Sequence, residues 1–84
     1  MFDLYFVIRS VTYAQRGRDV LENAGIRCQL TRSPRSISPS GCAYALMTGR
    51  GNASAAMRTL AAAEIPFSGP FLRQRGGEFR EMIV

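Results

Sequence analysis

The sequence contains no histidine, no tryptophan and no lysine, and all 11 of its basic residues are arginine. Without histidine it has no Ser-His or Cys-His pair for nucleophilic catalysis and no imidazole ligand for a metal ion. Without lysine it can form neither a Schiff base nor a Walker-type phosphate loop. The remaining chemical resources are two cysteines, six carboxylates, the hydroxyl groups and the guanidinium groups.

Cysteines and long hydrophobic runs are also scarce. Two cysteines are too few for a disulfide-stapled scaffold, so free thiols in a reducing compartment are expected. No apolar run approaches the roughly 18 to 20 residues that span a bilayer, and the opening residues 1–3 lack the basic region of a secretory signal. We therefore expect a cytoplasmic protein that needs neither a membrane nor a cofactor.

The size and composition are those of one small globular domain. The chain has 84 residues, of which 46% are hydrophobic and 20% charged. Because so short a chain buries only about 60% of its unfolded surface, dimerisation through an edge strand is a reasonable expectation. The net charge of +5 favours anionic partners but does not name one.

The hydrophobic pattern predicts four strands. Continuous apolar runs over residues 4–8 and 42–47 are typical of strands buried on both faces of a sheet. Residues 27–32 alternate, with Cys28 and Leu30 on the core side, as in a strand with one face in solvent. Residues 67–73 form the last strand, and Pro70 favours an edge position for it.

Two helices separate these strands. Residues 10–25 predict the first helix, in which Thr12 and Gln15 have the spacing of a capping box and Gly25 is placed to end the helix. The second is predicted from an N-cap at Asn52 to Ile65, where Pro66 stops it. The predicted inner faces are Ala14, Gly17, Leu21 and Ala24 with Val20 alongside, and Ala53, Ala56, Met57, Leu60 and Ala61.

The resulting order, βαββαβ, predicts a ferredoxin-like α/β sandwich: a four-stranded antiparallel sheet with two helices on one face. In this topology the strand order is 4-1-3-2, which makes the two continuous apolar runs central. Residues 1–73 form the predicted domain, and residues 74–84 form a C-terminal tail that either docks or stays flexible. A loop rich in proline, serine and glycine covers residues 33–41.

Cys42 is the candidate reactive group, because it begins the third predicted strand beside the start of the first helix, residues 9–12. Free N–H groups at a helix N-terminus, with Arg9 and Arg35 nearby, lower the pKa of a thiol. Ser40 and Gly41 would donate hydrogen bonds and allow close approach of the backbone. The alternative is a small buried hydrophobic residue, which is the common role of a lone cysteine in an apolar run.

Other candidate sites are weaker. Cys28 is expected in the core, with a resolving thiol as the alternative, although the simple register does not favour a direct disulfide with Cys42. An RNA-binding sheet is a further alternative: Arg27, Gln29 and Arg32 lie on one strand, and Tyr5 and Tyr44 lie on the two central strands. However, the third strand lacks the RRM consensus, so nucleic acid is not the expected partner. The six carboxylates show no metal-ligand spacing.

Several segments together resemble the small bacterial Se/S carrier protein-like family over about residues 4–71. They are Ser10-x-Thr12-x-Ala14 and Ala24-Gly25-Ile26 around the first helix, Pro34-Arg35 in the loop, and the run from Gly41 through Cys42 to Leu46. The resemblance implies a one-domain α/β protein whose Cys42 holds sulfur or selenium, with Pro34, Arg35 and Gly41 as its context. Where the family pattern leads us to expect glycine after the cysteine, this chain has Ala43, which narrows access to the thiol.

The resulting hypothesis is a carrier rather than a complete enzyme. Cys42 would accept sulfur or selenium as a persulfide-type adduct from a donor protein and pass it to an acceptor protein. Arg35 would stabilise the anionic adduct, while Ser40, Gly41, Arg9, Ser10 and Thr12 would shape the binding site. The alternative is a small regulatory or interaction module that binds an anion or a partner at residues 33–42, with a structural cysteine.

Overall fold

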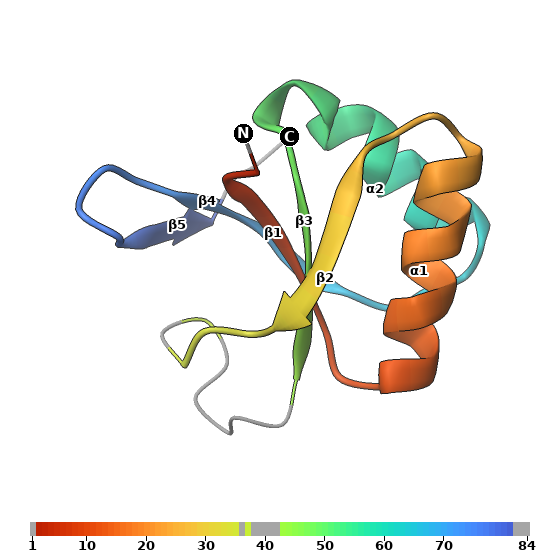
Figure 1. Cartoon of the computed structure of the whole chain (residues 1–84), viewed down its shortest axis with the longest axis horizontal. Helices are drawn as coiled ribbons and strands as arrows, with labels where there is room; N and C mark the ends of the chain where they lie inside the picture. The colour runs from red at the N-terminus through yellow and green to blue at the C-terminus, as the bar shows by residue number, and fades with distance from the viewer. Residues whose placement is uncertain (1, 36, 38–42, 82–84) are drawn as a thin grey trace.

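One antiparallel sheet carries two helices on one face (Figure 1). The computed structural model describes residues 2–35, 37 and 43–81. Over these residues the elements are β1 (Leu4–Ile8), α1 (Val11–Asn23), β2 (Cys28–Arg32), β3 (Tyr44–Thr48), the 3-10 helix η1 (Arg50–Asn52), α2 (Ala53–Ala62), β4 (Ser68–Arg73) and β5 (Phe79–Glu81). The strand order is β2-β3-β1-β4-β5. The first four strands thus have the predicted order, whereas the predicted count of four strands is wrong.

β1 is the central strand, and all five of its residues are buried. It pairs with β3 on one side and β4 on the other, as the continuous apolar run predicted. Leu4, Phe6 and Ile8 point toward the helices, while Tyr5 and Val7 lie on the opposite face because side chains alternate along a strand.

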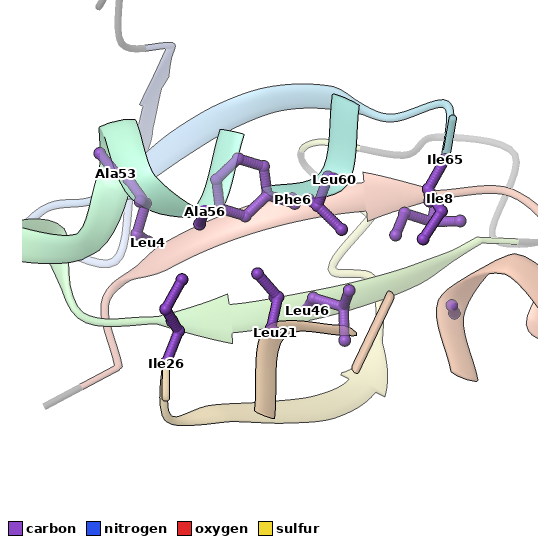
Figure 2. Packing of buried hydrophobic residues seen from close by; sticks show 11 residues of the cluster. Leu4, Phe6, Ile8, Leu21, Ile26, Leu46, Ala53, Ala56, Leu60 and Ile65 are labelled. Carbon is purple, nitrogen blue, oxygen red and sulfur yellow. The ribbon is translucent and has the colours of Figure 1, made fainter. Parts of the chain in front are cut away.

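The hydrophobic core lies between the helices and the sheet (Figure 2). Phe6 is completely buried, and its ring meets that of Phe67 edge-on with 5.2 Å between centroids. Each large side chain buried in this way contributes about 1.5–3 kcal/mol relative to an exposed one. The cluster consists of Leu4, Phe6, Ile8, Ala14, Leu21, Ile26, Leu46, Ala53, Ala56, Leu60 and Ile65.

α1 packs closely against β3 because it carries a glycine at the contact. An ideal Cβ on Gly17 would lie 2.7 Å from Cδ1 of Leu46 and 3.2 Å from Cδ2 of Leu60. Ala14, Gly17 and Leu21 are buried as predicted. Ala24 is exposed instead, because α1 ends at Asn23 and Ala24 is its C-cap.

The predicted capping box at Thr12 is wrong, since α1 begins two residues earlier than that motif requires. Ser10 is the N-cap, with extended backbone angles, and its Oγ accepts from the Tyr13 N–H at 3.5 Å. Thr12 is therefore inside the first turn and is exposed. Ser10 and Thr12 are both residue types that cap helices, so the sequence pattern alone does not distinguish between them.

Both helices end in a Schellman motif. In α1 the N–H groups of Gly25 and Ile26 donate to the carbonyls of Glu22 and Leu21, and Gly25 has φ +80° as its predicted role requires. α2 ends at Ala62 rather than at Ile65, so Pro66 does not stop it. Ala61, which was predicted on the inner face of this helix, is exposed.

The signal that ends α2 is a left-handed residue that is not glycine. Glu64 has φ 58°, and its N–H and that of Ile65 donate to the carbonyls of Ala61 and Leu60. At the other end of α2, Asn52 occupies the N-cap position without a side-chain capping bond. No helix in the described part of the chain is both long and apolar enough to cross a bilayer.

The predicted edge position of β4 is also wrong, because β4 lies between β1 and β5. Tyr5 pairs with Phe71 and Val7 with Ser68, so two residues of β4, one of them Pro70, oppose one residue of β1 in a bulge. Proline is tolerated there because a bulged residue need not donate to the ladder.

β5 extends the sheet with residues that the sequence assigned to the tail. The turn after β4 is closed by the Gln74 N–H, which donates to the Glu78 carbonyl at 2.7 Å. On the face away from the helices, the Phe79 ring meets that of Tyr5 edge-on at 4.8 Å. This aromatic pair and the ladder to β4 hold the hairpin against the sheet.

Candidate functional site

The core of the predicted site, Cys42 with Ser40 and Gly41, lies outside the described residues. The residues on either side of the loop are described. The Ser33 N–H donates to the Ala43 carbonyl at 3.0 Å, directly beyond the paired residues Arg32 and Tyr44. Ala43, the residue after Cys42, is therefore anchored at the start of β3 and is buried.

The start of β3 lies beside the end of β1. Tyr44 pairs with Ile8, and two residues after Ile8 the chain reaches Ser10, the N-cap of α1 (Figure 1). Because β1 and β3 are antiparallel, the topology brings residues 8–11 and 43–44 to the same end of the sheet. Figure 1 shows this end at the lower edge of the molecule.

The first turn of α1 presents the positive end of the helix dipole at this end of the sheet. The turn contains no acidic residue, so no carboxylate from it offsets the positive end of the helix dipole. Arg9 is exposed immediately before the N-cap, and Arg35 is exposed in a turn of the loop. Within the described part of the chain, neither arginine forms an ion pair.

A cavity of about 350 Å³ opens at the same end, on the β4 side of β1. Arg9, Ser10 and Tyr13 line it from the β1–α1 junction, whereas Thr12 is not among its lining residues. The opposite wall comes from the connection between α2 and β4. The complete lining is Val7, Ile8, Arg9, Ser10, Tyr13, Pro66, Phe67 and Ser68.

Sequence reasoning found Arg9 and Ser10 of this lining but missed Tyr13, Phe67 and Ser68. The Arg16 guanidinium lies over the Tyr13 ring, 5.9 Å from its centroid, and helps to hold the ring in place. Phe67 and Ser68 are more than fifty positions from Tyr13 in the printed sequence. No local motif connects them, so only the pairing of β1 with β4 reveals this wall.

Cys28 lies at the other end of the sheet, paired with Thr48. It packs against the core together with Leu30, and its Sγ lies 3.7 Å from the Arg18 carbonyl. Burial raises the pKa of the Cys28 thiol, and the negative charge of Glu22 adds to this effect. A protonated thiol is a poor nucleophile, so these surroundings favour a structural role over that of a resolving thiol.

The two tyrosines of the RNA-binding alternative do not share a surface. Tyr5 lies on the sheet face away from the helices and is 6% exposed, whereas Tyr44 packs against the core on the helix side. Base stacking on a sheet needs aromatic rings side by side on one open face. Tyr5 and Tyr44 therefore form no common stacking platform.

The described residues hold no group of three Cys, Asp or Glu side chains arranged to bind a metal ion. The end of the sheet that carries Arg9 and the start of α1 instead has the features of an anion-stabilising environment: helix N–H groups, an exposed arginine that pairs with no described carboxylate, and a neighbouring cavity. Such an environment stabilises a thiolate or another small anion.

Comparison with known protein families agrees with the resemblance in the sequence. The family model described as "Putative Se/S carrier protein-like" matches residues 3–71, more than half of the chain. The chain belongs to this Se/S carrier protein-like family. Neither the curated proteins nor the solved structures that were searched contain a match.

The family match covers α1, α2 and the first three strands together with most of β4. It includes position 42 and the loop before it. The match ends at residue 71, before Arg73, Arg75 and β5. The family model therefore does not describe the turn and the second strand of the β4–β5 hairpin.

Proposed function

We propose that this protein carries sulfur or selenium on the Cys42 thiol as a persulfide-type adduct. The single observation that supports this most strongly is the family match over residues 3–71, which contains the only cysteine of the chain that follows the Pro34-Arg35 loop. The family description indicates a carrier, and a thiol is the one side chain of this sequence able to form such an adduct.

The proposed loading step is a nucleophilic substitution at sulfur. The Cys42 thiolate attacks the outer sulfur of a donor persulfide, a new S–S bond forms, and the S–S bond within the donor breaks. The donor leaves as a thiolate. The outer sulfur, which keeps its proton, is now bonded to the sulfur of Cys42. No external oxidant or reductant is consumed. Unloading repeats the step with an acceptor thiolate as the attacking group.

This chemistry requires a thiolate at neutral pH, and the chain has no histidine or lysine to generate one. Arginine charge and helix N–H groups are the means that remain. The acid-free first turn of α1 and the exposed Arg9 support such an environment at the end of the sheet where β3 begins. In the proposal, Arg35 stabilises the anionic adduct, and Ser40 and Gly41 donate backbone hydrogen bonds.

We further propose that the ferredoxin-like βαββαβ unit is the family core and that β5 is an addition to it. The family match ends at residue 71, within β4. The partners would be a donor protein and an acceptor protein in the cytoplasm. A second copy could add to β2, which is the longer of the two edge strands in the described sheet.

Intact-protein mass spectrometry tests the carrier proposal. Reduced Cys28→Ser and Cys42→Ser proteins are each incubated with glutathione persulfide, and a second series uses the selenium analogue of this donor. We expect Cys28→Ser to gain the mass of one sulfur atom, and Cys42→Ser to gain little because the Cys28 thiol is half-buried with a raised pKa. Adding a thiol acceptor should then remove the adduct.

The matched pair of variants also identifies the alternative. If Cys28→Ser gains no mass while Cys42→Ser does, Cys42 is not the carrier residue. If neither variant gains mass and the wild-type loop still binds an anion or a partner protein, the interaction module is the better description.

A further inference from the structure

A second site lies at the opposite end of β1 from the start of α1. It is a cavity of about 360 Å³ lined by Phe2, Asp3, Arg50, Arg73, Gln74 and Arg75. Three parts of the chain meet there: the residues before β1, the η1 segment and the hairpin between β4 and β5. We propose that this cavity binds a small phosphate monoester.

The lining carries an excess of positive charge. Among the described residues, the lining contains three arginines and a single carboxylate, that of Asp3. Glu78 and Glu81 belong to the same hairpin but do not line the cavity. A phosphate monoester carries about 1.5 to 2 negative charges at pH 7, which matches the two arginines that Asp3 leaves uncompensated.

Asp3, the one acid among the described lining residues, is already paired with one of the arginines. Nε and one Nη of Arg50 donate to the same oxygen of Asp3, Oδ2, at 3.2 and 2.7 Å. This bond lowers the pKa of the Asp3 carboxyl, which therefore stays ionised at neutral pH. Arg50 is fixed in place yet 64% exposed, and its guanidinium retains three N–H donors for a ligand.

The hairpin that supplies Arg73 and Arg75 is held by backbone bonds. The Arg73 N–H donates to the Asp3 carbonyl at 2.8 Å, which joins the end of β4 to the start of β1. The Gly77 N–H donates to the Gln74 carbonyl at 2.9 Å and closes the turn around Arg75. Neither Arg73 nor Arg75 forms an ion pair with a carboxylate of the described residues. Both arginines are exposed residues, which makes them accessible to an oxyanion from solution.

The chemistry and size of the cavity indicate the ligand class. Guanidinium groups form paired hydrogen bonds to phosphate oxygens, which a lysine cannot match. A volume of about 360 Å³ is at the small end of the range of ligand sites, roughly 300 to 1,000 Å³. It suits a small organic phosphate whose organic part contacts the half-buried Phe2.

Nuclear magnetic resonance titration of the complete protein tests this site. Phenyl phosphate is the main probe, inorganic phosphate shows whether the organic part contributes, and benzoate is the singly charged control. We expect phenyl phosphate to shift the backbone amide signals of Asp3, Arg50 and residues 73–75, and to bind more tightly than benzoate.

A pair of double variants separates the site from general attraction by charge. Arg73→Gln/Arg75→Gln should weaken phenyl phosphate binding about tenfold or more, because two charge-assisted hydrogen-bond donors are lost. Arg32→Gln/Arg58→Gln removes the same charge from exposed positions on β2 and α2 and should bind nearly as the wild type does.

Four results would overturn the proposal: no shift of these signals in the wild type, equal weakening in both double variants, benzoate binding as tight as that of phenyl phosphate, or tighter binding of a single-stranded RNA oligonucleotide at the same amides. Sulfur loading of Cys42 is measured separately, so failure of the phosphate site leaves the carrier proposal standing, and the reverse also holds.

Discussion

The two ends of β1 differ in how they would attract an anion. At the end that leads into α1, the attraction comes from helix N–H groups and one exposed arginine beside a cavity with Tyr13 and Phe67 in its walls. At the other end, the described lining of a second cavity combines three arginines with one carboxylate, which pairs with Arg50. The first arrangement acts over a short range and suits a thiolate fixed to the chain. The second provides full charges and suits a ligand that arrives from solution.

The largest expected effect comes from breaking the core that joins the two ends. Phe6→Ala removes a completely buried ring from the middle of β1, including its edge-on contact with Phe67. We expect the free energy of unfolding to fall by about 3–5 kcal/mol, which is a large part of the stability of a small domain. Urea unfolding followed by circular dichroism measures the change.

Val11→Ala is the control for this substitution. Val11 is 42% exposed, so its truncation should change the free energy of unfolding by less than about 0.5 kcal/mol. A loss for Phe6→Ala no larger than that of the control would show that the described core is incorrect.

A smaller effect distinguishes the two hydroxyl residues at the start of α1. Ser10→Ala removes the N-cap and should destabilise the protein by about 0.5–1 kcal/mol, whereas the exposed Thr12→Ala should be nearly neutral. The same urea experiment compares the two variants. The reverse order of effects would restore Thr12 as the cap and move the start of the helix away from Arg9.

The smallest expected effect concerns the arginine-rich end and depends on pH. Asp3→Asn breaks the pair with Arg50 and should lower the free energy of unfolding at pH 7 by less than about 1 kcal/mol, since Arg50 is largely exposed. The pKa of Asp3 is lowered in the folded protein, chiefly by its hydrogen bond from Arg50. Its contribution is therefore present above the usual aspartate pKa of about 3.9 and is lost as the pH falls through the folded pKa.

The matching measurement is the difference in unfolding free energy between wild type and Asp3→Asn as a function of pH. The difference should shrink as the solution is made more acidic than about pH 4. A difference that stays constant through this range would mean that the ionised Asp3 does not contribute through Arg50.

Most of the fold could be predicted because its signals are local. The continuous apolar runs identified the central strands, and Gly25 marked the end of α1. Two errors came from proline. Pro70 favours an edge position only if β4 pairs regularly with its neighbours. β4 instead forms a bulge opposite β1, and a proline is tolerated at a bulge. Pro66 follows a helix that Glu64 has already ended in a left-handed conformation, which nothing in the sequence near it indicates.

β5 and the site were harder to predict for the same reason. Phe79–Glu81 is only three residues long, which is too short for a clear strand pattern. Its pairing with β4 is local, but the contact of Phe79 with Tyr5 joins residues distant in sequence. The cavity beside Ser10 and the arginine-rich cavity likewise combine segments that meet only in the folded sheet. Composition singled out arginine as the available cation, but only the topology groups Arg50, Arg73 and Arg75.

The central claim, a thiolate at Cys42, is tested most directly by the rate of its alkylation as a function of pH. In the Cys28→Ser protein we expect an apparent pKa clearly below the free-thiol value of about 8.5. In the Cys42→Ser protein the remaining Cys28 should titrate above that value, because burial raises its pKa. An apparent pKa of Cys42 at or above about 8.5 would contradict the claim.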